Sequence, residues 1–233
     1  MNKMVMVLGA SLSVLVAGCA TTSGTAGSSA GTPIAEAVRS GFLPDYSKLS
    51  PVEGKEGFQR YIDRGANLQP YSKLYIEPVQ VFLNTDNAYS GVQPDVMKRI
   101  TDSFYKAFVD TVTPAYQVVG APGPDVLRVR MAITGMQPVS TPLGVTDFIP
   151  IKAIFNAGRA LAGEAPRLAE LSAELEVIDG QNRQVAAAVV TRKSDKTLAQ
   201  GDQITWSDLS PIVYAWAKQF RQGLDDLRGT GPR

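Results

Sequence analysis

LAELSAELEVIDGQNRQVAAAVVTR, residues 168–192, is the stretch that decides the fold. Its first half alternates apolar and polar side chains, which is the period of a strand with two different faces. Residues 179–182, Asp-Gly-Gln-Asn, predict a hairpin turn, and residues 183–192 predict the returning strand. The first strand of this hairpin then has an apolar face and a polar face. The apolar face carries Leu171, Ala173, Leu175 and Val177, and the polar face carries Glu170, Ser172, Glu174 and Glu176.

Three further strands are predicted upstream of this hairpin. Residues 126–136 alternate in the same way, and residues 115–119 form a short apolar run. Residues 74–83 suit a first strand, although Pro78 weakens this prediction because proline cannot donate to a neighbouring strand.

Two amphipathic helices are predicted from apolar side chains that recur every three to four residues. The first covers residues 94–112, where Pro94 suits the first turn, and the second begins at Ser207 and Asp208. The first stripe consists of Val96, Met97, Ile100, Phe104, Ala107, Phe108 and Val112, and the second of Leu209, Ile212, Val213, Trp216, Phe220, Leu224 and Leu227.

The order of elements predicts an α/β (α+β) domain. We expect a mostly antiparallel sheet of about four to five strands, with helices packed on at least one of its faces. Residues 40–73 carry aromatic side chains between proline and glycine turns, and we expect them to form an ordered but irregular segment that its aromatics fix to the domain.

The N-terminus predicts a lipid anchor. Residues 4–16 are almost wholly apolar and have about the length of the apolar core of a signal peptide, which is shorter than the roughly 20 residues of a spanning helix. Val16, Ala17 and Gly18 precede Cys19 in a pattern that resembles a bacterial lipobox. We expect lipidation of Cys19; an uncleaved membrane helix and a plain secretory signal are the alternatives.

These features predict three parts of the chain: a lipoprotein signal peptide over residues 1–18, the lipidated Cys19 with a flexible linker over residues 19–40, and a single α/β domain over residues 41–233. The residue after the cysteine is Ala20. An aspartate at this position would resemble the signal that retains lipoproteins at the inner membrane. The expected location is therefore the outer membrane, with the domain facing the periplasm and the lipid on Cys19 as its membrane contact.

Composition restricts the chemistry of the domain. Removal of residues 1–18 takes away only one charge, that of Lys3, and leaves 22 basic and 22 acidic side chains, a balance that argues against a nucleic-acid partner. The chain has no histidine and a single cysteine, so histidine-based triads, dyads and zinc sites are excluded. We expect no catalytic residue, no metal and no cofactor.

Two other groups of residues are candidates for a functional role. The first is Arg128 and Arg130 on one predicted strand with Glu170, Glu174 and Glu176 on another. We expect these charges to form a stripe on a solvated sheet face and to pair across strands; catalysis and a polar partner-binding surface are the alternatives. Residues 148–162 form an apolar insertion. It packs on the core, covers a substrate pocket, or acts as a self-association or membrane-contact element, with Ile151, Ile154 and Phe155 as the possible interface.

Four stretches resemble a known family. They are SGFLPDYSKLSPV (residues 40–52), RYIDRGANLQPYSKLYIEPVQVFL (60–83), VSTPLG (139–144) and ITWSDLSPIVYAWAKQFRQGLDDL (204–227). Together they resemble the bacterial lipoproteins of domain of unknown function 3313, over residues 40–227. This resemblance implies a lipid-anchored envelope protein with no established activity and no catalytic residues to transfer.

The leading hypothesis is a non-enzymatic binding or adaptor domain in the periplasm. A second hypothesis is an oligomeric assembly or secretion accessory that uses residues 148–162. A third is a carrier of a small ligand or lipid, which an enclosed apolar pocket would support.

Overall fold

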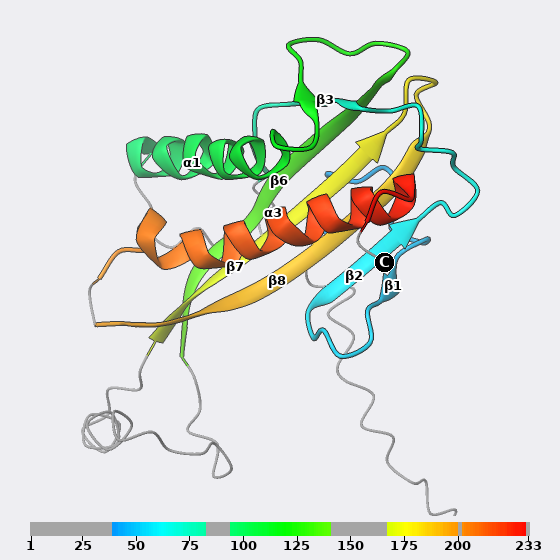
Figure 1. The fold of residues 1–233 in the computed structure, drawn as a ribbon. Coiled ribbons are helices and arrows are strands. Elements are labelled where there is room, and N and C mark those ends of the chain that lie inside the picture. Colours follow the sequence, from blue (N-terminus) through cyan, green and yellow to red (C-terminus); the bar gives the residue numbers. More distant parts are fainter. Residues whose placement is uncertain (1–38, 83–93, 141–166, 200–201, 232–233) are drawn as a thin grey trace, which may run out of the picture. The chain divides into compact units, whose positions relative to one another are not determined.

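The structure, a computed structural model, describes residues 39–82, 94–140, 167–199 and 202–231 (Figure 1). All of these residues belong to one unit, residues 34–233. Within the described ranges the unit is an α+β domain with an eight-stranded mixed sheet and two long helices.

The strand order in the sheet is β1-β2-β8-β7-β6-β3-β5, and β4 pairs separately with β6. The long strands β6, β7 and β8 are antiparallel to one another and form its centre. The strands are β1 (Ser50–Pro51), β2 (Phe58–Ile62), β3 (Lys73–Ile76), β4 (Gln80–Val81), β5 (Gln117–Val118), β6 (Val126–Ser140), β7 (Arg167–Ile178) and β8 (Gln184–Leu198).

The predicted central hairpin is confirmed. β7 and β8 pair across the turn at residues 179–182, where Asp179 accepts hydrogen bonds from the backbone of Gln181 and Arg183 at 2.9 Å each. Gly180 is required in this turn, because a Cβ at that position would collide with the carbonyl group of Pro124.

The prediction of a mostly antiparallel sheet of four to five strands is inexact. β3 lies parallel to both β5 and β6, and β4 lies parallel to β6. The strand expected over residues 74–83 is divided at Pro78 into β3 and β4, because proline has no N–H to continue the ladder. β1 and β2 were not expected at all, since the sequence of β2, FQRYI, shows no simple alternation.

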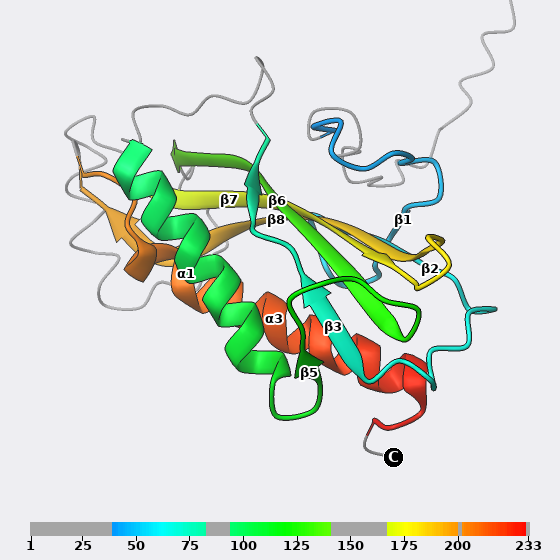
Figure 2. The same cartoon turned by 90° about the horizontal axis from the view of Figure 1, so that it is seen from above.

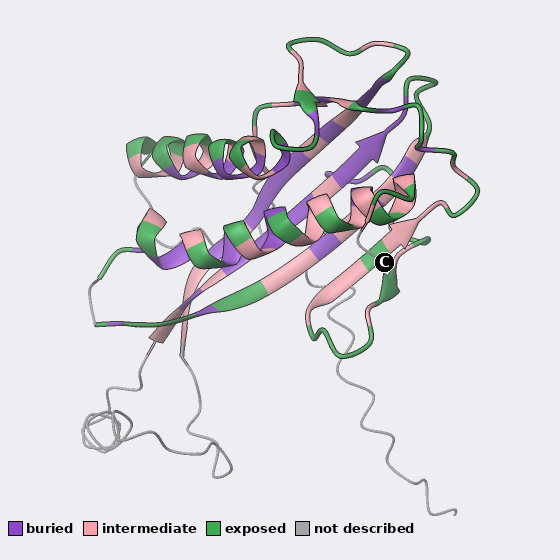
Figure 3. Ribbon diagram, in the orientation of Figure 1, coloured by how far each residue is buried: buried purple, intermediate pink, exposed green. Residues whose placement is uncertain are grey.

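Both predicted helices are confirmed. Helix α1 (Pro94–Val112) and helix α3 (Trp206–Arg228) lie on the same face of the sheet and pack against each other (Figure 2). Their apolar stripes form the main core with the inward faces of β3, β6 and β7. Figure 3 shows the buried residues concentrated on β6, β7 and the inner sides of the two helices.

The opposite face of the sheet is covered by the chain segment of residues 39–49, which we call the N-terminal strap. Phe42 and Leu43 of the strap are buried and form a second apolar cluster with Ala132, Ala187 and Val189. Figure 2 shows this segment on the side of the sheet away from both helices. The expectation that aromatic residues fix this part of the chain to the domain is therefore confirmed at Phe42.

The strap overturns the expected solvated charge stripe. Glu174 and Glu176 are only 1% and 2% exposed. Glu176 accepts a 2.6 Å hydrogen bond from Arg130, so the predicted cross-strand pairing is confirmed in a buried setting. Glu174 instead accepts a 2.7 Å hydrogen bond from the hydroxyl of Tyr46 and a 3.2 Å bond from the backbone N–H of Ser40. Alternation identified these side chains as polar, but the segment that covers them is distant in the sequence.

Candidate functional site

The two helices do not cover the full width of the sheet. Two helices of about 10 Å diameter cover about 20 Å, whereas seven strands at about 4.8 Å spacing extend over roughly 29 Å. Helix α3 packs on β7 and β8. The next strand along, β2, therefore lies at the margin of the helical layer, and a cleft opens between β2 and the C-terminal half of α3.

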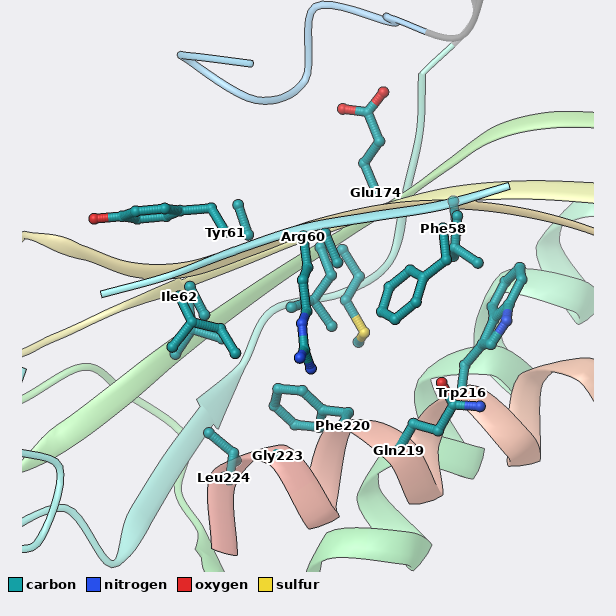
Figure 4. Close-up of a pocket in the computed structure, with 18 of the residues that line it drawn as sticks. Phe58, Arg60, Tyr61, Ile62, Glu174, Trp216, Gln219, Phe220, Gly223 and Leu224 are labelled. Carbon is teal, nitrogen blue, oxygen red and sulfur yellow. The ribbon is translucent and has the colours of Figure 1, made fainter. Parts of the chain in front are cut away.

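This cleft, which we call the α3 cleft, has a volume of about 270 Å³. It is larger than the roughly 150 Å³ engineered apolar cavity that binds benzene, and close to the lower end of the about 300–1,000 Å³ of ligand pockets. Its walls are mainly apolar (Figure 4). The main lining side chains are Phe58, Phe104, Phe108, Met131, Trp216 and Phe220.

Aromatic contacts between the helices form the inner wall of the cleft. Phe104 and Phe108 of α1 stack at 5.3 Å, and Phe108 lies 5.7 Å from the ring of Phe220 on α3. Such pairs contribute about 0.5–1.5 kcal/mol beyond the area that they bury. The inner wall is therefore a fixed feature of the helix packing.

Small residues keep the cleft open. Gly223 lies within α3 and lines the cleft, and a Cβ at this position would meet nothing within 4 Å. Glycine inside a helix costs about 0.5–1 kcal/mol relative to alanine, so its presence here leaves space at the expense of stability. On the side of the cleft opposite Gly223, part of the floor is formed by Ala186 and Ala188 of β8. Alanine is depleted in strands.

Three exposed charged side chains lie among the lining residues, the cations Lys55 and Arg60 and the carboxylate Asp226. Figure 4 shows Arg60 projecting from β2 toward α3, on the same side of the strand as Phe58 and Ile62. Glu174 also borders the cleft, but its carboxylate points to the opposite face of the sheet, where the strap covers it (Figure 4).

The two ends of α3 are fixed by polar contacts. At the first turn, Asp208 accepts hydrogen bonds from Thr205 N–H at 2.9 Å and from Lys196 Nζ at 2.6 Å. Burial opposes ionisation of Asp208, but these bonds prevail and lower its pKa. Near the last turn, Tyr116 donates a 2.8 Å hydrogen bond to Asp225. Burial, together with this bond to an acidic group, raises the pKa of Tyr116 to about 12.

A family model described as "Protein of unknown function (DUF3313)" matches residues 38–220. The chain belongs to the DUF3313 family. The resemblance inferred from the sequence is thereby confirmed. No curated protein matches this DUF3313 chain.

The DUF3313 chain matches solved structures that share little sequence with it. The dodecamer of a PelC point variant from Paraburkholderia phytofirmans is 11% identical and covers 72% of this chain and 95% of its own, with a TM-score of 0.37. Protein XCC0632 from Xanthomonas campestris, which matches a DUF330 family model, is 12% identical over 70% of this chain and 89% of its own, also with a TM-score of 0.37.

The site residues predicted for this DUF3313 chain lie outside the described ranges. This applies to Val16, Ala17, Gly18 and Cys19 of the lipobox and to Ile151, Ile154 and Phe155 of the apolar insertion. Their predicted roles stay predictions. No helix within the described ranges is long and apolar enough to cross a membrane. Within the same ranges, no three acidic or cysteine side chains are grouped as ligands for a metal ion.

The α3 cleft itself was not predicted from the DUF3313 sequence. Phe220 and Leu227 were expected in the core as members of the second helical stripe, but both are only partly buried because they line the cleft. The signals that were present are a glycine inside an amphipathic helix and a run of three alanines in a strand. Both indicate space beside the backbone that large side chains do not fill.

Proposed function

We propose that this protein is a non-enzymatic binding domain of the bacterial envelope, which takes a ligand with an apolar chain into the α3 cleft. The observation that carries the proposal is a cleft of about 270 Å³ with mainly apolar walls, which Gly223, Ala186 and Ala188 keep open. This favours the third of the hypotheses drawn from the sequence, the small-ligand or lipid carrier, as the form that binding takes.

A binding role fits the chemistry of the walls better than a catalytic one. The charged side chains that line the cleft are exposed to solvent, apart from the carboxylate of Glu174, which faces away. Acid–base catalysis needs titratable groups whose pKa values are shifted toward the working pH by their surroundings. An apolar cleft instead contributes affinity by removing apolar surface from water, about 25 cal/mol for each Å².

Filling the cleft is expected to abolish binding without unfolding the domain. In Gly223→Leu the new side chain extends into the open space beside α3, and leucine is a better helix former than glycine. We expect the affinity for the neutral fluorescent probe N-phenyl-1-naphthylamine to fall at least tenfold. Fluorescence titration measures it on residues 19–233 with Cys19→Ser, which carry neither the lipid nor the apolar segment of residues 4–16.

Lys218→Leu is the matched control, because it adds the same side chain to an exposed position of α3 that does not line the cleft. It should leave the probe affinity unchanged. Equal affinities for the parent chain and Gly223→Leu, with both folded by circular dichroism, would overturn the proposal.

The membrane anchor is a separate part of the proposal and is supported by the sequence Val16-Ala17-Gly18-Cys19. Two or three acyl chains on Cys19 would give stable attachment, since each buried methylene contributes about 0.8 kcal/mol. Metabolic labelling with palmitate should mark the wild-type chain and not Cys19→Ser, and the wild-type chain should fractionate with the outer membrane. Label retained by Cys19→Ser would contradict this assignment.

A further inference from the structure

We infer that the ligand of the α3 cleft is a detached single-chain amphiphile with an anionic head, such as a fatty acid, and that Arg60 binds the head. This inference rests on the proposed function and adds the chemical class of the ligand. It follows from the position of one arginine on the apolar side of β2.

Arg60 occupies a position where the strand would otherwise present an apolar side chain. Its neighbours on the same side of β2 are Phe58 and Ile62, and all three line the cleft (Figure 4). The aliphatic stem of an arginine covers apolar surface while the guanidinium stays in water. The stem of Arg60 thus forms part of the cleft wall, and its charge lies where the cleft meets solvent.

The guanidinium of Arg60 has no hydrogen-bond or ion-pair partner among the described residues. The two arginines of β6 differ, since Arg128 contacts Glu77 at 2.7 Å and Arg130 contacts Glu176 at 2.6 Å. A planar guanidinium presents paired donors that match a carboxylate. Arg60 is therefore available to a carboxylate that arrives with the ligand.

Lys55 adds a second cation to the cleft. Its Nζ donates a 3.3 Å hydrogen bond to the neutral side chain of Gln219 on α3, and it lies 5.6 Å from the ring of Phe58. A lysine ammonium has three donors, so this contact leaves donors available. Asp226 is the single carboxylate exposed at the cleft, which leaves one net positive charge there.

Charge and shape together select the class of occupant. The inner part of the cleft, at Phe108 and Phe220, accepts an apolar chain, and the outer part, at Arg60, accepts a negative charge. A membrane-embedded phospholipid has two chains and would have to leave the bilayer to enter. A single chain with a carboxylate matches both parts of the cleft.

The test is competition against N-phenyl-1-naphthylamine on the Cys19→Ser chain of residues 19–233. Decanoate, decanol and decyltrimethylammonium share one apolar chain and differ in head charge. We expect decanoate to compete about fivefold better than decanol, since an exposed ion pair contributes up to about this factor, and decyltrimethylammonium to compete worst. The preference should shrink as salt is added, because salt screens exposed charges.

Arg60→Gln should remove most of the preference for decanoate over decanol, because glutamine has no charge to pair with the carboxylate. The matched control is Arg64→Gln, which removes an exposed arginine that does not line the cleft and should change neither affinity. If decanoate and decanol compete equally in the parent chain, or if Arg60→Gln retains the preference, the inference is overturned while Gly223-dependent probe binding still supports the proposed function.

A sedimentation experiment separates a detached amphiphile from a lipid surface. The Cys19→Ser chain of residues 19–233 is mixed with phosphatidylglycerol vesicles, with and without Arg60→Gln. We expect no difference in the sedimented fraction between the two chains. Arg60-dependent sedimentation would assign Arg60 to a membrane surface and overturn the inference.

Discussion

Replacing Glu176 with alanine is expected to lower the free energy of unfolding by about 3 kcal/mol. The side chain is almost fully buried and accepts hydrogen bonds from Arg130 at 2.6 Å and from Gln184 at 2.8 Å. Removal of one partner of a buried ion pair costs about 3–5 kcal/mol, because the other charge stays behind. We expect the lower end, since Arg130 retains Glu77 at 3.7 Å and the ring of Phe42 at 4.9 Å. Urea denaturation measures the loss.

Two variants show whether the loss comes from the buried charge. Glu170→Ala, on the same strand, removes a partly exposed carboxylate with one 3.0 Å hydrogen bond from Gln137 and should cost under about 1 kcal/mol. The double variant Arg130→Met with Glu176→Leu removes both charges and should unfold near the wild-type midpoint, because an apolar pair often replaces a buried ion pair without loss. A loss for Glu176→Ala as small as that for Glu170→Ala would contradict the expectation.

Replacing Tyr46 with phenylalanine is expected to lower the free energy of unfolding by about 2–3 kcal/mol and to release the N-terminal strap. The hydroxyl group donates to Glu174 at 2.7 Å and accepts from the backbone N–H groups of Gly41 at 2.9 Å and Leu43 at 3.3 Å. A buried donor or acceptor left without its partner costs about 1–3 kcal/mol. Urea denaturation gives the total effect, and hydrogen exchange at the N–H groups of Gly41 and Leu43 gives the local one.

Tyr61→Phe is the matched control for Tyr46→Phe. Tyr61 packs against the same apolar cluster, but its hydroxyl has no hydrogen bond to a described residue, so the change should be within about 0.5 kcal/mol of zero. If Tyr46→Phe is as mild as Tyr61→Phe, the strap is held by its apolar side chains alone.

The same hydroxyl group links stability to alkaline pH. Burial, and then the hydrogen bond to Glu174, raises the pKa of Tyr46 above its ordinary value of 10.0. The folded state therefore keeps this proton when the unfolded state has lost it, so this contribution to stability is complete below pH 10 and declines above it. Tyr46→Phe should lose less stability than the wild type as the pH rises above 10.

The parts of the fold that follow from local patterns were predictable from the sequence. Helix α1 was expected over residues 94–112 and runs from Pro94 to Val112, because its apolar stripe continues without a break. The hairpin of β7 and β8 was equally clear, since alternation and a four-residue turn agree. β2 was not predictable in this way, because Arg60 lies on the same side of the strand as Phe58 and Ile62 and breaks the alternation.

The environment of the glutamates on β7 depends on long-range packing. Alternation identifies Glu174 as polar, and a polar face of an antiparallel sheet is ordinarily solvated. Tyr46, which covers it, is 128 residues away in the sequence, and no local pattern connects the two. The cleft is similar, because its walls come from α1, α3, β2, β6, β7 and β8 and their separation is set by tertiary packing.

Short strands at the margins of the sheet affect how this domain meets other chains. β1 and β5, at the two ends of the strand order, have two residues each, and β1 ends in Pro51, which has no N–H. Long uncovered edge strands offer rows of unpaired backbone groups that template aggregation and strand exchange. These margins offer very few such groups. The margins at β1 and β5 are thereby poor templates for strand exchange, which would matter in a crowded compartment where many copies lie close together.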